Sequence, residues 1–172
     1  MIDIYLDELI RFFSRGGSVL YIVFTIAFFL WGLLIDRFIY LYFSFKKIKQ
    51  SILQNLKENT YDMRFKNEIH TYIVEDMRLE LSKGLDFIKT LIIVCPLVGL
   101  LGTVTGMIEV FDVMSLLGNS DVKSMANGVS MATIPTMAGM VIALSGILFE
   151  RKLENTINYQ VDMLDLEISK VI

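Results

Sequence analysis

The sequence predicts an all-α membrane protein with three transmembrane helices and long cytoplasmic helical extensions. Hydrophobic residues make up 54% of its 172 residues, and the mean hydropathy is +0.57. Three runs carry no charged residue: Ser18 to Ile35, Thr90 to Ile108 and Ser124 to Phe149. A helix needs roughly 20 apolar residues to cross the hydrocarbon core, so the first run qualifies if it extends past Asp36. The other fold that lipid permits is a closed β-barrel, and the sequence lacks the period-2 alternation that a barrel requires.

We expect seven segments along the chain. They are a periplasmic or interfacial amphipathic helix (1–17), transmembrane helix 1 (18–45), a cytoplasmic helical domain (46–85), transmembrane helix 2 (86–115), a periplasmic hinge (116–123), transmembrane helix 3 (124–150) and a cytoplasmic C-terminal helix (151–172).

The orientation follows from the distribution of Lys and Arg. Segment 46–89 carries nine basic side chains, whereas 1–17 carries two and the hinge one: the nine are Lys46, Lys47, Lys49, Lys57, Arg64, Lys66, Arg78, Lys83 and Lys89. Basic loops stay in the cytoplasm, so the N-terminus and hinge are predicted to be periplasmic and the C-terminus cytoplasmic. No small-residue cleavage site follows the first run, which favours a retained span over a removed signal peptide.

The sequence gives little support for an enzymatic or metal-binding function. Cys95 is the single cysteine and His70 the single histidine, and neither has a ligand-type companion nearby. We interpret Cys95 as a small packing residue and His70 as a surface histidine. No set of nucleophile, base and oxyanion donors appears, so we expect no enzyme and no cofactor. The mixed charges of 46–89 form no basic stripe, which argues against nucleic-acid binding.

The second and third spans are rich in small and hydroxylated residues, which distinguishes them from simple anchors. Gly99, Gly102 and Gly106 recur at helical spacing in one span. The other places small residues on one face around Pro135: Ala132, Thr136, Gly139, Ala143 and Gly146. Such faces allow close helix packing, with hydroxyls as interhelical glue, or they line a polar path. Glu109 and Asp112 likewise mark either the end of the span in water or a cation-attracting rim.

The outer segments read as helices with one apolar face. Apolar residues of the tail recur at helical spacing, which predicts packing on a partner helix: they are Leu153, Ile157, Val161, Leu164 and Ile168. Gly16-Gly17 is expected to end the first helix, and Asn59-Thr60 and Gly84 to break segment 46–89. We expect the second membrane helix to rise from near Leu79.

Two motifs resemble a known family. G-L-L-G-T-V-T-G-M-I at 99–108 and M-A-N-G-V-S-M-A-T-I-P-T-M-A-G-M at 125–140 resemble the second- and third-span signatures of the ExbB/TolQ/MotA proton-channel family. The short chain and the phrase G-T-V-T-G-M-I-E-V-F-D-V-M look most like the short ExbB subunit of a TonB energising system.

The resemblance implies an assembly and a function. Family members form homopentameric rings in the bacterial inner membrane around two helices of an ExbD-type one-span partner dimer, which brings the proton-carrying aspartate. The ring converts the proton-motive force into mechanical work on a TonB-type transducer for uptake across the outer membrane. A TolQ- or MotA-like stator of a different energised system, or a non-conducting membrane scaffold, is the alternative.

The resemblance also implies a proton pathway. Thr103 and Thr136 match the family's second- and third-span pore threonines, and Thr133, Thr105 and Ser130 lie beside them. Met131 stands where relatives often have a third-span glutamate. Glu109 stands where they often have a histidine, and is the candidate substitute carboxylate at the periplasmic entrance. Helix packing is expected from six positions: Gly99, Gly102, Gly106, Pro135, Gly139 and Ala143.

Overall fold

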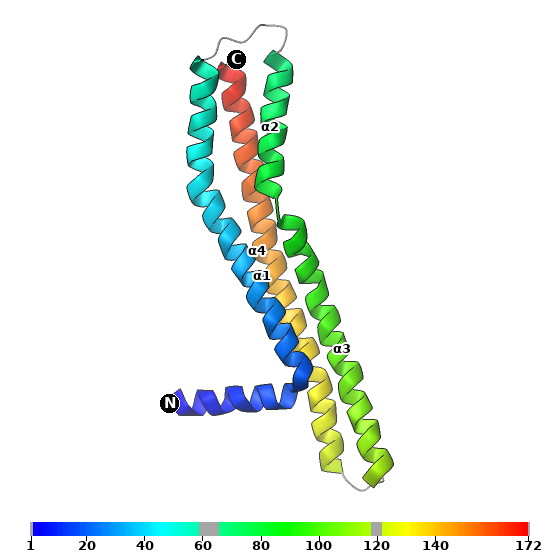
Figure 1. Ribbon diagram of the computed structural model, residues 1–172. Helices are drawn as coiled ribbons and strands as arrows, with labels where there is room; N and C mark the ends of the chain where they lie inside the picture. The colour runs from blue at the N-terminus through cyan, green and yellow to red at the C-terminus, as the bar shows by residue number, and fades with distance from the viewer. Residues whose placement is uncertain (1, 59–65, 118–121, 172) are drawn as a thin grey trace. The chain divides into compact units, whose positions relative to one another are not determined.

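The computed structural model describes residues 2–58, 66–117 and 122–171, and it contains four helices in this part of the chain (Figure 1). They are α1 (Ile2–Glu58), α2 (Lys66–Ser82), α3 (Leu85–Leu117) and α4 (Val122–Val171). Within the described residues, three stretches are long and apolar enough to cross a membrane: one in α1, one ending in α3 and one in α4. The all-α, three-span prediction is confirmed to this extent. The expected break at Asn59-Thr60 and the turn at 118–121 lie outside the described residues.

Two glycines in the left-handed region interrupt the helical path. Gly17 has φ 66° and Gly84 has φ 86°, a conformation that costs other residues a Cβ clash. At Gly17 the first turns of α1 bend away from the rest of the helix (Figure 1). At Gly84 the chain ends α2 and starts α3. The expected helical rise from near Leu79 was therefore wrong, because the backbone at Gly84 delays the start of α3 to Leu85.

The chain divides into two compact units. The first contains residues 1–31 and 90–147. Val19 and Val23 of α1 pack with Cys95 of α3, and four partly buried residues surround them: Ile26, Val98, Ala138 and Ile142. Cys95 is fully buried as a free thiol, which confirms its interpretation as a packing residue.

The second unit contains residues 32–89 and 148–172. All five apolar positions of the tail are at most 3% exposed, so the predicted amphipathic packing is confirmed, and it occurs within one chain. Lys49 of α1 pairs with Glu167 of α4 at 2.7 Å. Nε2 of His70, on α2, lies 3.2 Å from a carboxylate oxygen of Asp165, on α4. His70 is half-buried at a helix–helix contact, which corrects the interpretation of it as a surface histidine.

Large apolar side chains remain exposed on the first unit. Phe28 is 77% exposed on α1, and Val141 and Leu144 are 67% and 63% exposed on α4. Exposed apolar side chains on helices long enough to cross a membrane are expected to face lipid or another chain. The second unit also exposes large apolar side chains, among them Tyr42 at 75% and Leu79 at 71%.

Candidate functional site

Helices α3 and α4 meet main chain to main chain, and this contact is built from the glycines of α3. A Cβ added at Gly99 would lie 2.8 Å from the carbonyl oxygen of Pro135, and one at Gly106 would lie 2.7 Å from the backbone nitrogen of Ala132. A Cβ at Gly102 would lie 2.7 Å from the Pro135 side chain. Because real Cβ atoms do not approach this closely, only glycine allows the two helices to lie at this separation.

The glycines of α4 complete the same contact. A Cβ at Gly139 would meet the carbonyl oxygen of Cys95 at 2.8 Å, and one at Gly128 would collide with the side chain of Val110. Ala143 is 5% exposed on the same face. The glycine face of each span is thus filled by the other span of the same chain, as the scaffold alternative requires, and leaves no space for a lumen between α3 and α4 of one protomer.

Thr136 joins the two helices at this contact. Its hydroxyl donates a hydrogen bond to the Gly99 carbonyl oxygen at 2.8 Å, and the residue is half-buried. A hydroxyl has one proton and two acceptor lone pairs. The proton of Thr136 is therefore committed to α3, while its oxygen keeps the capacity to accept.

The other predicted hydroxyls bond to their own helices. Thr103 donates to the Leu100 carbonyl at 2.7 Å, and Thr105 donates to the Gly102 carbonyl at 3.1 Å. Thr133 is exposed, and its hydroxyl lies 3.2 Å from a carbonyl oxygen one turn back. Ser130 and Thr103 are half-buried. Among these five residues, only Thr136 forms a hydrogen bond to the other helix of the hairpin, whereas the hydroxyls of Thr103, Thr105 and Thr133 bond within their own helices.

Met131 and Glu109 line one small crevice, together with Gly17 of the α1 bend. Its volume is about 10 Å³, close to the least that a single water needs. Ser18 and Thr105 add hydroxyls to the lining. The predicted substitute carboxylate and the position of the missing glutamate therefore adjoin the same polar space, although Glu109 itself is exposed.

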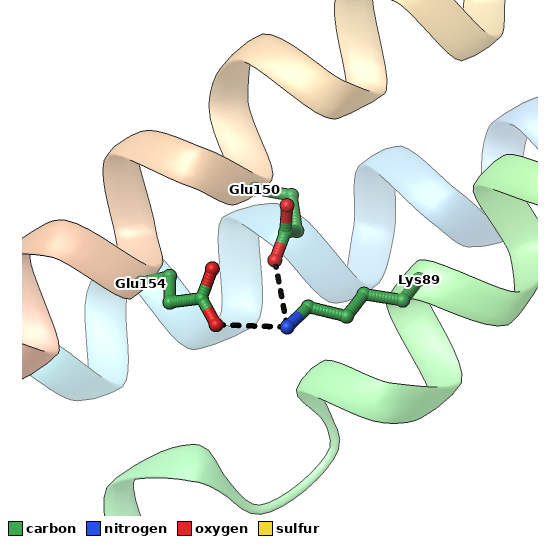
Figure 2. A network of polar contacts seen from close by, with 3 residues as sticks. All are labelled: Lys89, Glu150 and Glu154. Atoms are coloured by element: carbon green, nitrogen blue, oxygen red, sulfur yellow. Dashed lines mark hydrogen bonds and ion pairs between the residues drawn. The ribbon is translucent and has the colours of Figure 1, made fainter.

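A second polar cluster lies in the other unit, where α3 meets α4 (Figure 2). Lys89 of α3 extends between two carboxylates of α4. Its Nζ lies 2.8 Å from Oε1 of Glu154 and 3.4 Å from Oε1 of Glu150. Glu150 is 6% exposed. The sequence analysis overlooked this group, although one signal was present: Glu150 is the first charge after 26 uncharged residues.

Comparison with known proteins places the chain in a family of channels. The model of the MotA/TolQ/ExbB proton channel family matches residues 42–166, which include α3 and most of α4. The chain therefore belongs to this family, which is non-enzymatic. No solved structure matches the chain with significance.

Among the relatives, the names point to ExbB. The chain is 28% identical to "Biopolymer transport protein exbB1" of Vibrio cholerae, over 60% of this chain and 51% of the relative. It is 26% identical to a biopolymer transport protein "ExbB-like 1" of Helicobacter pylori, over 92% of this chain and 97% of the relative. An "ExbB-like 1" protein of Synechocystis is 35% identical over 48% of this chain. The chain spans between 33% and 51% of the length of the first four relatives.

Proposed function

We propose that this protein is an inner-membrane proton-channel subunit that, with an ExbD-type partner, converts the proton-motive force into mechanical work on a TonB-type transducer. Five copies would form a ring around the partner's membrane helices. The family match and the ExbB relatives support the class. The observation that carries the proposal is the hydroxyl of Thr136, held at the α3–α4 contact in a span of the predicted proton pathway.

The lumen in this proposal lies outside the glycine contact, because the two spans of one chain close on each other. The flanks of the hairpins, with Thr103 and Thr136 half-buried at their edge, would then face a cavity shared by the five copies. The N-terminus and the 116–123 hinge would be periplasmic, and segment 46–89 cytoplasmic, by the distribution of basic residues.

The direction of the threonine hydrogen bonds indicates which protonation state of the partner's acid the pathway would favour. Both hydroxyl protons are donated to backbone carbonyls, Thr136 to Gly99 and Thr103 to Leu100. Each oxygen is thereby left as an acceptor, and an acceptor binds a carboxylic acid but not a carboxylate. The hydroxyls would favour the neutral, protonated form of the partner's acid, which is also the form that a low-dielectric site favours.

The energy source is the electrochemical gradient. A charge that crosses the membrane gains about 2.3 kcal/mol per 100 mV of potential. Alternate protonation of the partner's acid from the periplasm and its deprotonation toward the cytoplasm would change its preferred contacts, and so step the inner helices relative to the ring.

The test replaces the Thr136 hydroxyl with a methyl group. The complex with its one-span partner is reconstituted in liposomes, and proton flux is followed with an internal pH dye under an imposed potential. Thr136→Val should lower the flux by about tenfold, the factor for one hydrogen bond of about 1.4 kcal/mol, while Thr136→Ser should keep it.

Thr156→Val is the matched control, because the hydroxyl of Thr156 also donates to a carbonyl of α4, at 2.7 Å, but outside the hairpin. It should conduct like the wild type. Wild-type flux in Thr136→Val would show that this hydroxyl only packs helices. A wild-type complex that conducts no protons would refute the channel and leave the non-conducting scaffold.

A further inference from the structure

Glu150 is the only charged side chain that is buried in the described part of the chain. It follows directly on the uncharged run 124–149, where α4 leaves its apolar stretch. Two fully buried apolar residues lie close to this cluster in the sequence: Ile88 directly before Lys89 on α3, and Leu153 three residues after Glu150 on α4. A carboxylate in such a place loses hydration, so it requires a compensating partner or a function.

The compensation that Glu150 receives is incomplete. Lys89 is the cation within reach, and its Nζ is closer to Glu154, at 2.8 Å, than to Glu150, at 3.4 Å (Figure 2). Oε1 of Glu150 has no hydrogen-bond partner among the described residues. One ammonium therefore serves two carboxylates, which gives the cluster a formal charge of −1 and the capacity to take up one proton.

A purely structural role does not account for Glu150. The pair of Lys89 and Glu154 already links α3 to α4 by a charge-assisted hydrogen bond. A second, buried carboxylate adds desolvation, and an apolar residue of similar volume commonly stabilises such a site better. An ionisable residue at the edge of a membrane span, whose Oε1 is compensated only by an ammonium at 3.4 Å that it shares with Glu154, instead has the chemistry of a proton-accepting group.

We propose that Glu150 accepts the transported proton at the cytoplasmic end of the pathway and that Glu154 releases it to water. This inference rests on the proposed function. The proton leaves the partner's carboxylic acid, directly or through water, and binds Oε1 of Glu150, which becomes a neutral acid. It then passes to Glu154 while Lys89 turns toward whichever carboxylate is charged, and ends on a cytoplasmic water molecule. No other reactant is needed.

The exposure of the three side chains follows this order. The side chain of Glu150 is 8% exposed, whereas those of Lys89 and Glu154 are 40% and 42% exposed. The cluster thus leads from a buried acceptor to a carboxylate in contact with solvent. Positive charges at Arg151 and Lys152 follow on α4, and both are exposed, as expected for a segment at the cytoplasmic membrane surface.

The decisive variant is Glu150→Gln, which keeps the size of the side chain and removes its proton affinity. In the liposome assay with the partner, flux should fall by about a hundredfold, the lower end of what a positioned proton acceptor contributes. Glu150→Asp should restore part of the flux. Glu167→Gln is the matched control, because it breaks the 2.7 Å ion pair of Lys49 between α1 and α4, outside the relay, and should conduct like the wild type.

A second readout separates proton uptake from folding. Lowering the cytoplasmic pH should increase the infrared band of protonated carboxylic acids in the wild type and in Glu167→Gln, and the difference spectrum between the wild type and Glu150→Gln should show the loss of one carboxylic acid per chain. A band of undiminished intensity in Glu150→Gln, or flux above half of the wild-type value, would overturn the relay. If that variant conducts while Thr136→Val does not, the relay fails and the channel stands. If the wild type does not conduct, both fail.

Discussion

The close contact of α3 and α4 makes a quantitative prediction for Gly99→Ala. The new Cβ would lie 2.8 Å from the Pro135 carbonyl oxygen and 3.0 Å from the Cα of Thr136. Comfortable contacts between such atoms are about 3.5 to 4.0 Å, so the helices must separate by roughly 0.5 to 1 Å. Neither obstacle is a flexible side chain, so a rotamer change cannot relieve the clash.

The free energy of this change can be estimated term by term. Overpacking costs about 1 to 3 kcal/mol, and separation also weakens the 2.8 Å hydrogen bond from Thr136, worth about 1 kcal/mol. Alanine returns about 1 kcal/mol through its better helix propensity. We therefore expect Gly99→Ala to destabilise the protein by about 1 to 3 kcal/mol, measured as the free energy of unfolding in a detergent titration.

Gly32→Ala is the matched control for this prediction. Gly32 is also helical, but an added Cβ would meet nothing within 4 Å. This variant should gain up to about 1 kcal/mol through helix propensity, so the two variants should differ by about 2 to 4 kcal/mol. If both variants unfold at the same denaturant concentration, the main-chain contact at Gly99 does not exist as described.

Two further predictions concern the second unit. Leu164→Ala should lower the free energy of unfolding by about 2 to 5 kcal/mol, because Leu164 is 0% exposed. Leu166→Ala, at a position 57% exposed, should change it by less than about 0.5 kcal/mol, and equal effects of the two variants would contradict the packing of α4 in this unit. Gly84→Ala should lower the melting temperature, since φ is 86° and the guanidinium of Arg37 would lie 3.1 Å from the new Cβ, which together cost about 1 to 2 kcal/mol. An unchanged melting temperature would show that α2 and α3 do not meet through this left-handed residue.

Hydrophobic periodicity predicted the large elements because burial acts on many residues at once. The tail positions from Leu153 to Ile168 repeat at helical spacing, and every one of them is buried. Gly17 and Gly84 were also foreseen as breaks, since glycine is the residue that tolerates positive φ. The expected rise of the second membrane helix from near Leu79 was wrong by six residues, because it carried the helix across the break foreseen at Gly84, and α3 begins at Leu85.

The hydrogen bonds and ion pairs of the site join residues on different helices, and the spacing of residues along the sequence does not predict these pairs. The sequence indicated that Thr136 is either glue or part of a path, but not that its hydroxyl proton is donated to Gly99, 37 residues away in the sequence. Glu150 looked like the ordinary end of a span. Only the fold brings Lys89 to 3.4 Å from its buried Oε1, an atom that has no hydrogen-bond partner among the described residues.

The glycine contact limits how closely α3 and α4, and with them the hydroxyls of Thr103 and Thr136, can approach each other. Where flexible side chains lie between two helices, changes of rotamer allow the distance between the helices to increase or decrease. Here backbone lies against backbone at Gly99 and Gly106, so no side-chain rearrangement can bring the two helices closer. The contact therefore sets a minimum distance between the two threonine-bearing helices, and this minimum does not depend on which rotamers the neighbouring side chains adopt.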